Sequence, residues 1–227
     1  MVARTKDILK QDDEFVSFWM KVIGFIYQHK NYFYIALAVV VAAGLVIWGL
    51  TYYRGKVEAG AWAAYESIMD QPPAQSEDAA QIKEAKEKTQ ADLIALIGER
   101  SGTKAALQAH LELAGMAAQE SDYPRAIEHY EIFLKGLPAH DPIRPATAQA
   151  IGQVYEAMGD LAKAAEWYHR VAESAELADL GLWDLGRVQE LAGQKEEARK
   201  TFQRLLNQHP NSIYASVVQQ RLLNLDQ

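Results

Sequence analysis

The sequence contains no cysteine among its 227 residues. This absence excludes disulfide bonds, thiolate metal sites, haem attachment through cysteine, a cysteine nucleophile and lipid attachment to cysteine. It leaves the cellular compartment open, because an exported protein can also lack cysteine.

Basic residues are few as well. Lys and Arg total 23 against 30 Asp and Glu, so the formal net charge is −7. A nucleic-acid partner is therefore disfavoured, because phosphate binding requires a basic face. With 49% hydrophobic and 23% charged residues, the composition is that of an ordered chain.

Catalytic motifs are also missing. The sequence has no glycine-rich phosphate loop, no Gly-x-Ser-x-Gly elbow and no His-Glu-x-x-His. Glu166 and His169 form one Glu-x-x-His pair, but di-iron bundles require two such motifs and two further glutamates. No second pair is present, so we interpret His169 as a surface residue. The sequence predicts no enzymatic activity, no metal and no cofactor.

One segment is strongly apolar. Residues 31–53, "NYFYIALAVVVAAGLVIWGLTYY", contain no charge, and Lys30 and Arg54 flank them. As a helix the segment is about 34 Å long, enough to cross a hydrocarbon core of about 30 Å. Aromatic residues gather at both ends, as at membrane–water interfaces. We expect an uncleaved transmembrane anchor, since the run is longer than the apolar core of a signal peptide. The alternative is a buried core helix.

The charges flanking this segment predict its orientation. Residues 1–30 carry five basic side chains, whereas the twenty residues after the anchor carry two. The positive-inside rule then places residues 1–30 in the cytoplasm. Apolar side chains in this segment recur at helical spacing, which predicts an amphipathic helix: Phe15, Trp19, Val22, Ile23 and Ile26. This helix either lies on the inner membrane surface, continues the anchor or packs on a partner.

Small and aromatic residues recur downstream in three units that start at Leu107, Pro145 and Asp179. Small residues at positions 8 and 20 allow two helices to approach closely, and an aromatic residue at position 24 fills the space between neighbouring units. Glycines at 159 and 193 suit the turn between the helices. The residues at positions 8, 20 and 24 are Ala114, Ala126 and Tyr130, then Gly152, Ala164 and Tyr168, then Gly186, Ala198 and Phe202.

These residues resemble the tetratricopeptide repeat over residues 104–227, with units at about 107–144, 145–178 and 179–212. The resemblance implies an all-α fold, with a single N-terminal transmembrane helix followed by an α-solenoid of helix pairs and a C-terminal capping helix from Ser212. Position 4, often tryptophan in the family, is His110, Ala148 and Leu182 here. Four extra residues in the loop "PAHDPIRPA" are expected to loosen the junction between the first two units.

Residues 54–103 separate the anchor from the repeats. Trp62, Tyr65, Ile68 and Met69 form an apolar stripe, and a charged helix is expected from Ala79 to Arg100. We interpret these residues as a divergent helix pair, with "QPPAQSED" at 71–78 between its two members.

The layout as a whole resembles the ancillary subunit family of the bacterial Sec translocon. The similarity rests on the position of the anchor, "AYESIM" after it, "ERSGTKAALQAHLELA" before the first repeat and the final "LLNL". It implies an inner-membrane protein whose C-terminal domain faces the periplasm. The implied partners are the translocon and a membrane-anchored periplasmic chaperone.

The family binds peptides or partner helices on a groove lined by the first helix of each pair. The resemblance places the groove at Gln108, Leu111, Gln119, Gln149, Gln153, Glu156, Leu180, Trp183, Arg187 and Glu190. Trp183 and Arg187 belong to the residue types enriched in interface hot spots. The alternative for Trp183 is that it packs under the capping helix.

Two functions from different classes follow. The first is an adaptor that binds protein partners as an accessory to the translocon and its chaperones. The second is a structural scaffold or oligomerising subunit of another cell-envelope complex. Ala38 and Ala42, four residues apart in the anchor, are consistent with helix pairing in a homo-oligomer.

Overall fold

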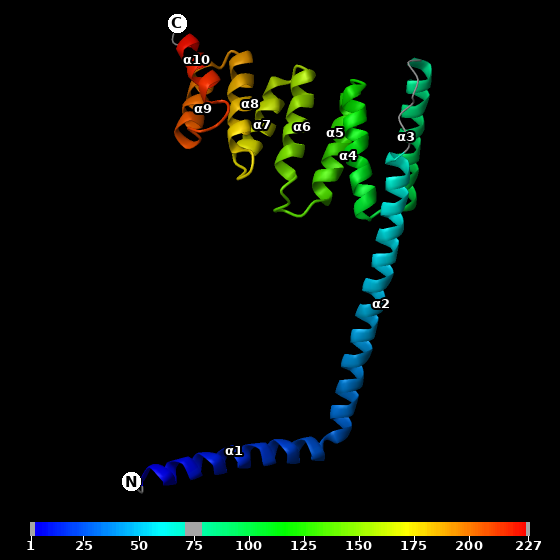
Figure 1. Ribbon diagram of the computed structural model, residues 1–227, viewed down its shortest axis with the longest axis vertical. Coiled ribbons are helices and arrows are strands. Elements are labelled where there is room, and N and C mark those ends of the chain that lie inside the picture. The colour runs from blue at the N-terminus through cyan, green and yellow to red at the C-terminus, as the bar shows by residue number, and fades with distance from the viewer. Residues whose placement is uncertain (1–2, 71–78, 226–227) are drawn as a thin grey trace. The chain divides into compact units, whose positions relative to one another are not determined.

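The computed structural model describes residues 3–70 and 79–225, with side chains from residue 16 onward. The side chain of Phe15, residues 71–78 and the last two residues of the predicted cap therefore lie outside the described part. Within it every regular element is a helix, as the sequence predicts (Figure 1). Its elements are α1 (Ala3–Gln28), α2 (Lys30–Met69), α3 (Ala79–Glu99), α4 (Lys104–Gln119), α5 (Tyr123–Gly136), α6 (Arg144–Ala157), α7 (Leu161–Ala172), α8 (Ala178–Leu191), α9 (Lys195–Gln208) and α10 (Ala215–Leu225).

The chain divides into two compact units, residues 1–56 and 57–227. In the first unit, one 18-residue window of α2 has a mean hydropathy of 2.5 and none of it is buried. Among the described helices, α2 is the one that is long and apolar enough to cross a membrane. Trp48 and Tyr52 stack at 5.8 Å near the end of its apolar part.

Helix α2 continues beyond the predicted anchor. The expected anchor, residues 31–53, is part of a longer helix, because the backbone stays helical from Lys30 to Met69. The residues after Lys56 belong to the second unit, where Ala61 is fully buried and Tyr65 packs in a cluster with Leu93 of α3. Residues 54–69 contain no proline, and the helix continues through Gly55 and Gly60.

The second unit is built from antiparallel helix pairs, α4 with α5, α6 with α7 and α8 with α9, which follow one another along the chain (Figure 1). Gly159 and Gly193 adopt φ of 79° and 74° in the turns of the second and third pairs. The turn of the first pair has Ser121 at φ 61° in the same place. Asp122 and Asp160 then cap the second helices by accepting hydrogen bonds from the amides of Arg125 and Lys163.

Close approach between helices depends on the small residues at position 8. A Cβ on Gly152 would lie 2.6 Å from the ring of Tyr168, and a Cβ on Gly186 would lie 2.3 Å from that of Phe202. Both rings are fully buried. In the first pair, where position 8 is Ala114, that residue packs with Ala126 and Tyr130. These residues are buried together with Ala164 and Ala198, and they form the interior of the repeats.

Candidate partner-binding surface

The predicted groove residues lie on the first helices of the three pairs, α4, α6 and α8. Two of them, Gln119 and Gln153, are exposed, and the other eight are half-buried. The exposed amide groups can donate and accept hydrogen bonds. Most of the half-buried residues already have partners within the chain, and these partners differ from one repeat to the next.

Between the second and third pairs, polar side chains form one connected network. Arg187 on α8 binds the carboxylate of Glu156 on α6 with both terminal nitrogens, and its Nη2 donates to Oε2 at 2.7 Å. Gln149 Nε2 donates to Asp184 Oδ2 at 3.0 Å, and Tyr168 donates to Glu156 at 2.8 Å. Three predicted groove residues therefore connect α6 to α8.

The charges within this network shift each other's pKa. The hydrogen bond from Arg187 lowers the pKa of Glu156, while burial opposes that shift. Burial raises the pKa of Asp184, which is only 6% exposed. Burial and the neighbouring Glu156 carboxylate raise the pKa of the Tyr168 hydroxyl above its usual range. The guanidinium of Arg187 remains charged, because the two carboxylates beside it favour its protonated form.

The groove face of the third pair contacts the C-terminal segment. Trp183 stacks on Tyr214 with ring centroids 5.5 Å apart and an interplanar angle of 5°. The guanidinium of Arg221 lies 5.3 Å from the Trp183 ring, and Arg221 Nη1 bonds Glu190 at 2.5 Å. The structure thus places Trp183 against the capping segment, the alternative to a binding role. Leu180 precedes it on α8 and is half-buried.

The groove face of the first pair contacts the end of α2. Gln108 Nε2 donates to Glu112 Oε1 at 3.1 Å, and the Tyr65 hydroxyl donates to the same oxygen at 2.9 Å. Burial, reinforced by Glu112, raises the pKa of Tyr65 to about 12. Leu111 packs against the core cluster around Ala114 and Tyr130.

Sequence reasoning missed Asp184 and Glu112. Each follows a residue assigned to the groove by one position, so the repeat positions that the family uses for binding do not include them. A signal exists for Asp184: it is the only charge in the stretch "LGLWDLG", and a charge within an apolar stretch of a packed helix requires partners.

The described residues contain no group of three metal-ligating side chains. His169, of the single Glu-x-x-His pair, is exposed, and its Nδ1 lies 4.0 Å from Glu173 Oε1.

Two histidines pair between α4 and α5, where the Nδ1 atoms of His110 and His129 lie 2.9 Å apart. Burial lowers the pKa of both imidazoles, and this favours the neutral pair, in which one ring donates to the other.

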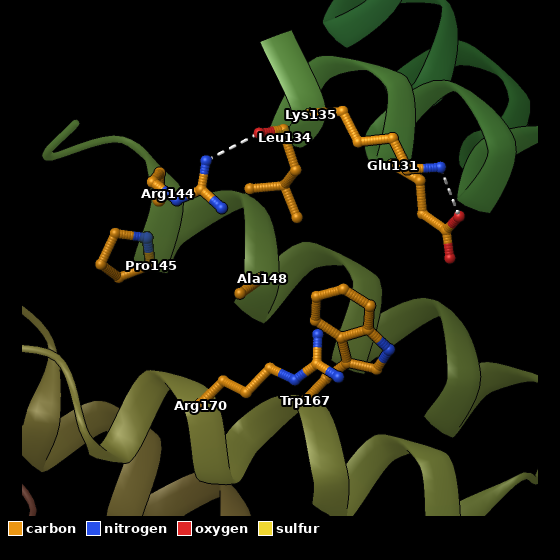
Figure 2. A pocket seen from close by; sticks show the side chains of 8 residues that line it. All are labelled: Glu131, Leu134, Lys135, Arg144, Pro145, Ala148, Trp167 and Arg170. Atoms are coloured by element: carbon orange, nitrogen blue, oxygen red, sulfur yellow. Dashed lines mark hydrogen bonds and ion pairs between the residues drawn. The ribbon is translucent and has the colours of Figure 1, made fainter. Parts of the chain in front are cut away.

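A second surface lies where the first pair meets the second. Here a pocket of about 470 Å³ opens between α5, α6 and α7 (Figure 2). We call this pocket the junction notch. None of its lining residues belongs to the predicted groove. They are Glu131, Leu134, Lys135, Arg144, Pro145, Ala148, Trp167 and Arg170.

Comparison with known protein families identifies two segments. Models of the tetratricopeptide repeat match residues 147–179 and 181–212, which are the second and third helix pairs. No curated protein shows significant similarity to the chain. The matches indicate a protein–protein interaction adaptor, since proteins built from this repeat are typically adaptors without enzymatic activity.

Proposed function

We propose that the chain is an inner-membrane-anchored adaptor whose repeats face the periplasm, and that it serves as an accessory to the Sec translocon and to a membrane-anchored periplasmic chaperone. The observation that carries the proposal is the succession of one apolar helix and stacked tetratricopeptide repeats in a single chain. The excess of basic residues before the apolar segment supports the orientation. The translocon assignment rests on the resemblance in layout.

Some residues of the proposed groove are already engaged within the chain. Trp183 is covered by Tyr214, and Arg187 is held by Glu156. Gln153 on α6 and Gln119 on α4 remain exposed. We therefore place the partner on the faces of α4 and α6, where a bound segment can hydrogen-bond to free amides without breaking the network.

Photocrosslinking in native membranes tests the partner. A benzoylphenylalanine at Gln153 samples the open groove, and one at Lys200, an exposed residue of α9, serves as the control. Mass spectrometry of the adducts identifies the partners. Translocon subunits or an envelope chaperone captured from position 153 but not 200 are the expected result.

Two other outcomes contradict the translocon role. A single unrelated envelope protein captured in stoichiometric amount favours a scaffold of another complex. Adducts between copies of this chain favour a homo-oligomer.

The absence of cysteine makes the orientation testable without background labelling. We expect Ser216→Cys, at an exposed position of α10, to react with a membrane-impermeant maleimide in intact spheroplasts. Gln28→Cys should react only after the membrane is permeabilised. The reverse pattern would place the repeats in the cytoplasm and remove the periplasmic assignment.

A further inference from the structure

The junction notch carries more positive than negative charge, although the whole chain is acidic. Three cationic side chains line it, Lys135, Arg144 and Arg170, against the single carboxylate of Glu131. That carboxylate points to Lys135, 3.7 Å away (Figure 2). Arg144 Nη1 donates to the carbonyl oxygens of Leu134 and Leu137 at the end of α5, at 2.7 and 3.2 Å. Its position in the wall of the notch is therefore fixed.

At the next junction along the chain, the same two positions form an ion pair. In the unit numbering, Lys135 and Glu173 both occupy position 29, and Arg170 and Arg204 both occupy position 26 of the following unit. At the second junction, Arg204 Nη1 lies 2.8 Å from Glu173 Oε1. At the first junction the acidic member is replaced by Lys135, so the two positions hold like charges that cannot pair. Lys135 pairs instead with Glu131 of its own helix, and among the described residues no ion pair joins Arg170 to a carboxylate.

The rest of the notch is apolar. Leu134 and Ala148, which are 8% and 7% exposed, form its floor, and Trp167 forms one wall. The Arg170 guanidinium lies 4.2 Å from the centroid of the Trp167 ring, and this contact orients the charge along the edge of the pocket (Figure 2). About 470 Å³ is sufficient for a medium-sized apolar side chain together with an adjacent carboxylate.

We propose that the junction notch binds an acidic segment of a partner protein. A Glu or Asp carboxylate of that segment pairs with Arg170, in the role that Glu173 has for Arg204 at the second junction. A neighbouring apolar side chain of the segment covers Leu134 and Trp167. The proposal deepens the adaptor role, and it depends neither on the translocon assignment nor on the groove around Gln153.

A peptide selection tests the proposal without assuming a partner. The full chain, held in nanodiscs of phosphatidylcholine, is panned against a library of random peptides. The same selection is made with Arg170→Gln, with Lys135→Glu and with the control Lys200→Gln. Lys135→Glu recreates the Glu–Arg pair of the second junction, so it should close the notch while the helices remain folded. Far-UV circular dichroism checks that they do.

The expected result is a class of peptides with Asp or Glu next to Leu, Ile or Phe, enriched by the wild type and by Lys200→Gln. In fluorescence anisotropy, one such peptide should bind Arg170→Gln about tenfold more weakly, because a charge-assisted hydrogen bond is lost. Lys135→Glu should abolish binding.

Three results overturn the proposal. The first is enrichment without acidic residues, and the second is enrichment of the same acidic peptides by wild type and Lys135→Glu. The third is binding of phosphatidylglycerol vesicles that Lys135→Glu abolishes while the selected peptides stay unchanged, which assigns the notch to a lipid headgroup. None of these results changes the crosslinks from Gln153, so the two proposals fail separately.

Discussion

Replacing Gly181 by alanine tests how tightly α7 and α8 approach one another. A Cβ on Gly181 would lie 2.2 Å from the backbone nitrogen of Ala172 and 2.5 Å from the carbonyl carbon of Val171. Ordinary contacts between such atoms are about 3.5 Å, so the two helices must separate by about 1 Å or more. The atoms in the way belong to a helix backbone, which cannot turn aside as a side-chain end can.

The magnitude follows from two opposing contributions. Overpacking of this kind costs about 3 kcal/mol, at the upper end of the usual range. Alanine recovers about 1 kcal/mol over glycine within a helix, which leaves a net loss of about 2 kcal/mol in the free energy of unfolding. Gly115→Ala is the matched control, because a Cβ at Gly115 in α4 meets nothing within 4 Å. It should gain about 1 kcal/mol.

Urea unfolding of the full chain in detergent micelles, followed by far-UV circular dichroism, measures both variants. The expected separation between Gly181→Ala and Gly115→Ala is about 3 kcal/mol. If Gly181→Ala is as stable as Gly115→Ala, the close approach of α7 and α8 at Gly181 is wrong.

Two further predictions concern the polar network and the cap. Glu156→Gln should lose about 2 kcal/mol of stability near neutral pH, because Arg187 and Tyr168 lose a charged partner. The pKa of Glu156 is lower in the folded state than in the unfolded state, so its contribution to the free energy of unfolding is fully present above the unfolded pKa and is lost as pH falls through the folded pKa. The difference in stability between Glu156→Gln and wild type should therefore narrow in acid. A constant difference in urea midpoints from neutral to acidic pH would contradict this. Trp183→Ala should cost about 3 kcal/mol and expose α10 to hydrogen exchange, because the Tyr214 ring loses its stacking partner. Unchanged exchange in α10 combined with lost crosslinks from Gln153 would instead restore a binding role for Trp183.

The fold class could be predicted because its signals are local. A run of 23 uncharged residues is visible without any tertiary information. The contact between Gly152 and Tyr168 can also be predicted from the sequence, because a small residue and an aromatic residue at fixed spacing meet across one helix hairpin. Helix turns at Gly159 and Gly193 are readable for a similar reason, because a left-handed backbone conformation favours glycine.

The position at which α2 ends was harder to predict from the sequence. The charges after Tyr53 mark the end of an apolar segment, and a helix can continue through such a change in polarity without a break. Its C-terminal part is positioned by contacts with distant residues, such as the bond from the Lys104 amide to Glu58 at 2.9 Å. A local pattern contains no information on such a contact.

The sequence by itself therefore determined the helical architecture, the apolar helix and the small and aromatic positions of each repeat, because these follow from residues within one hairpin. Only the tertiary structure decided which polar groups are already paired. Arg187 and Glu156 lie 31 positions apart, and Trp183 and Tyr214 the same distance. Lys135 and Arg170 line one notch only because α5 and α7 pack on α6. Such pairings depend on the stacking of successive repeats, which no short-range periodicity specifies.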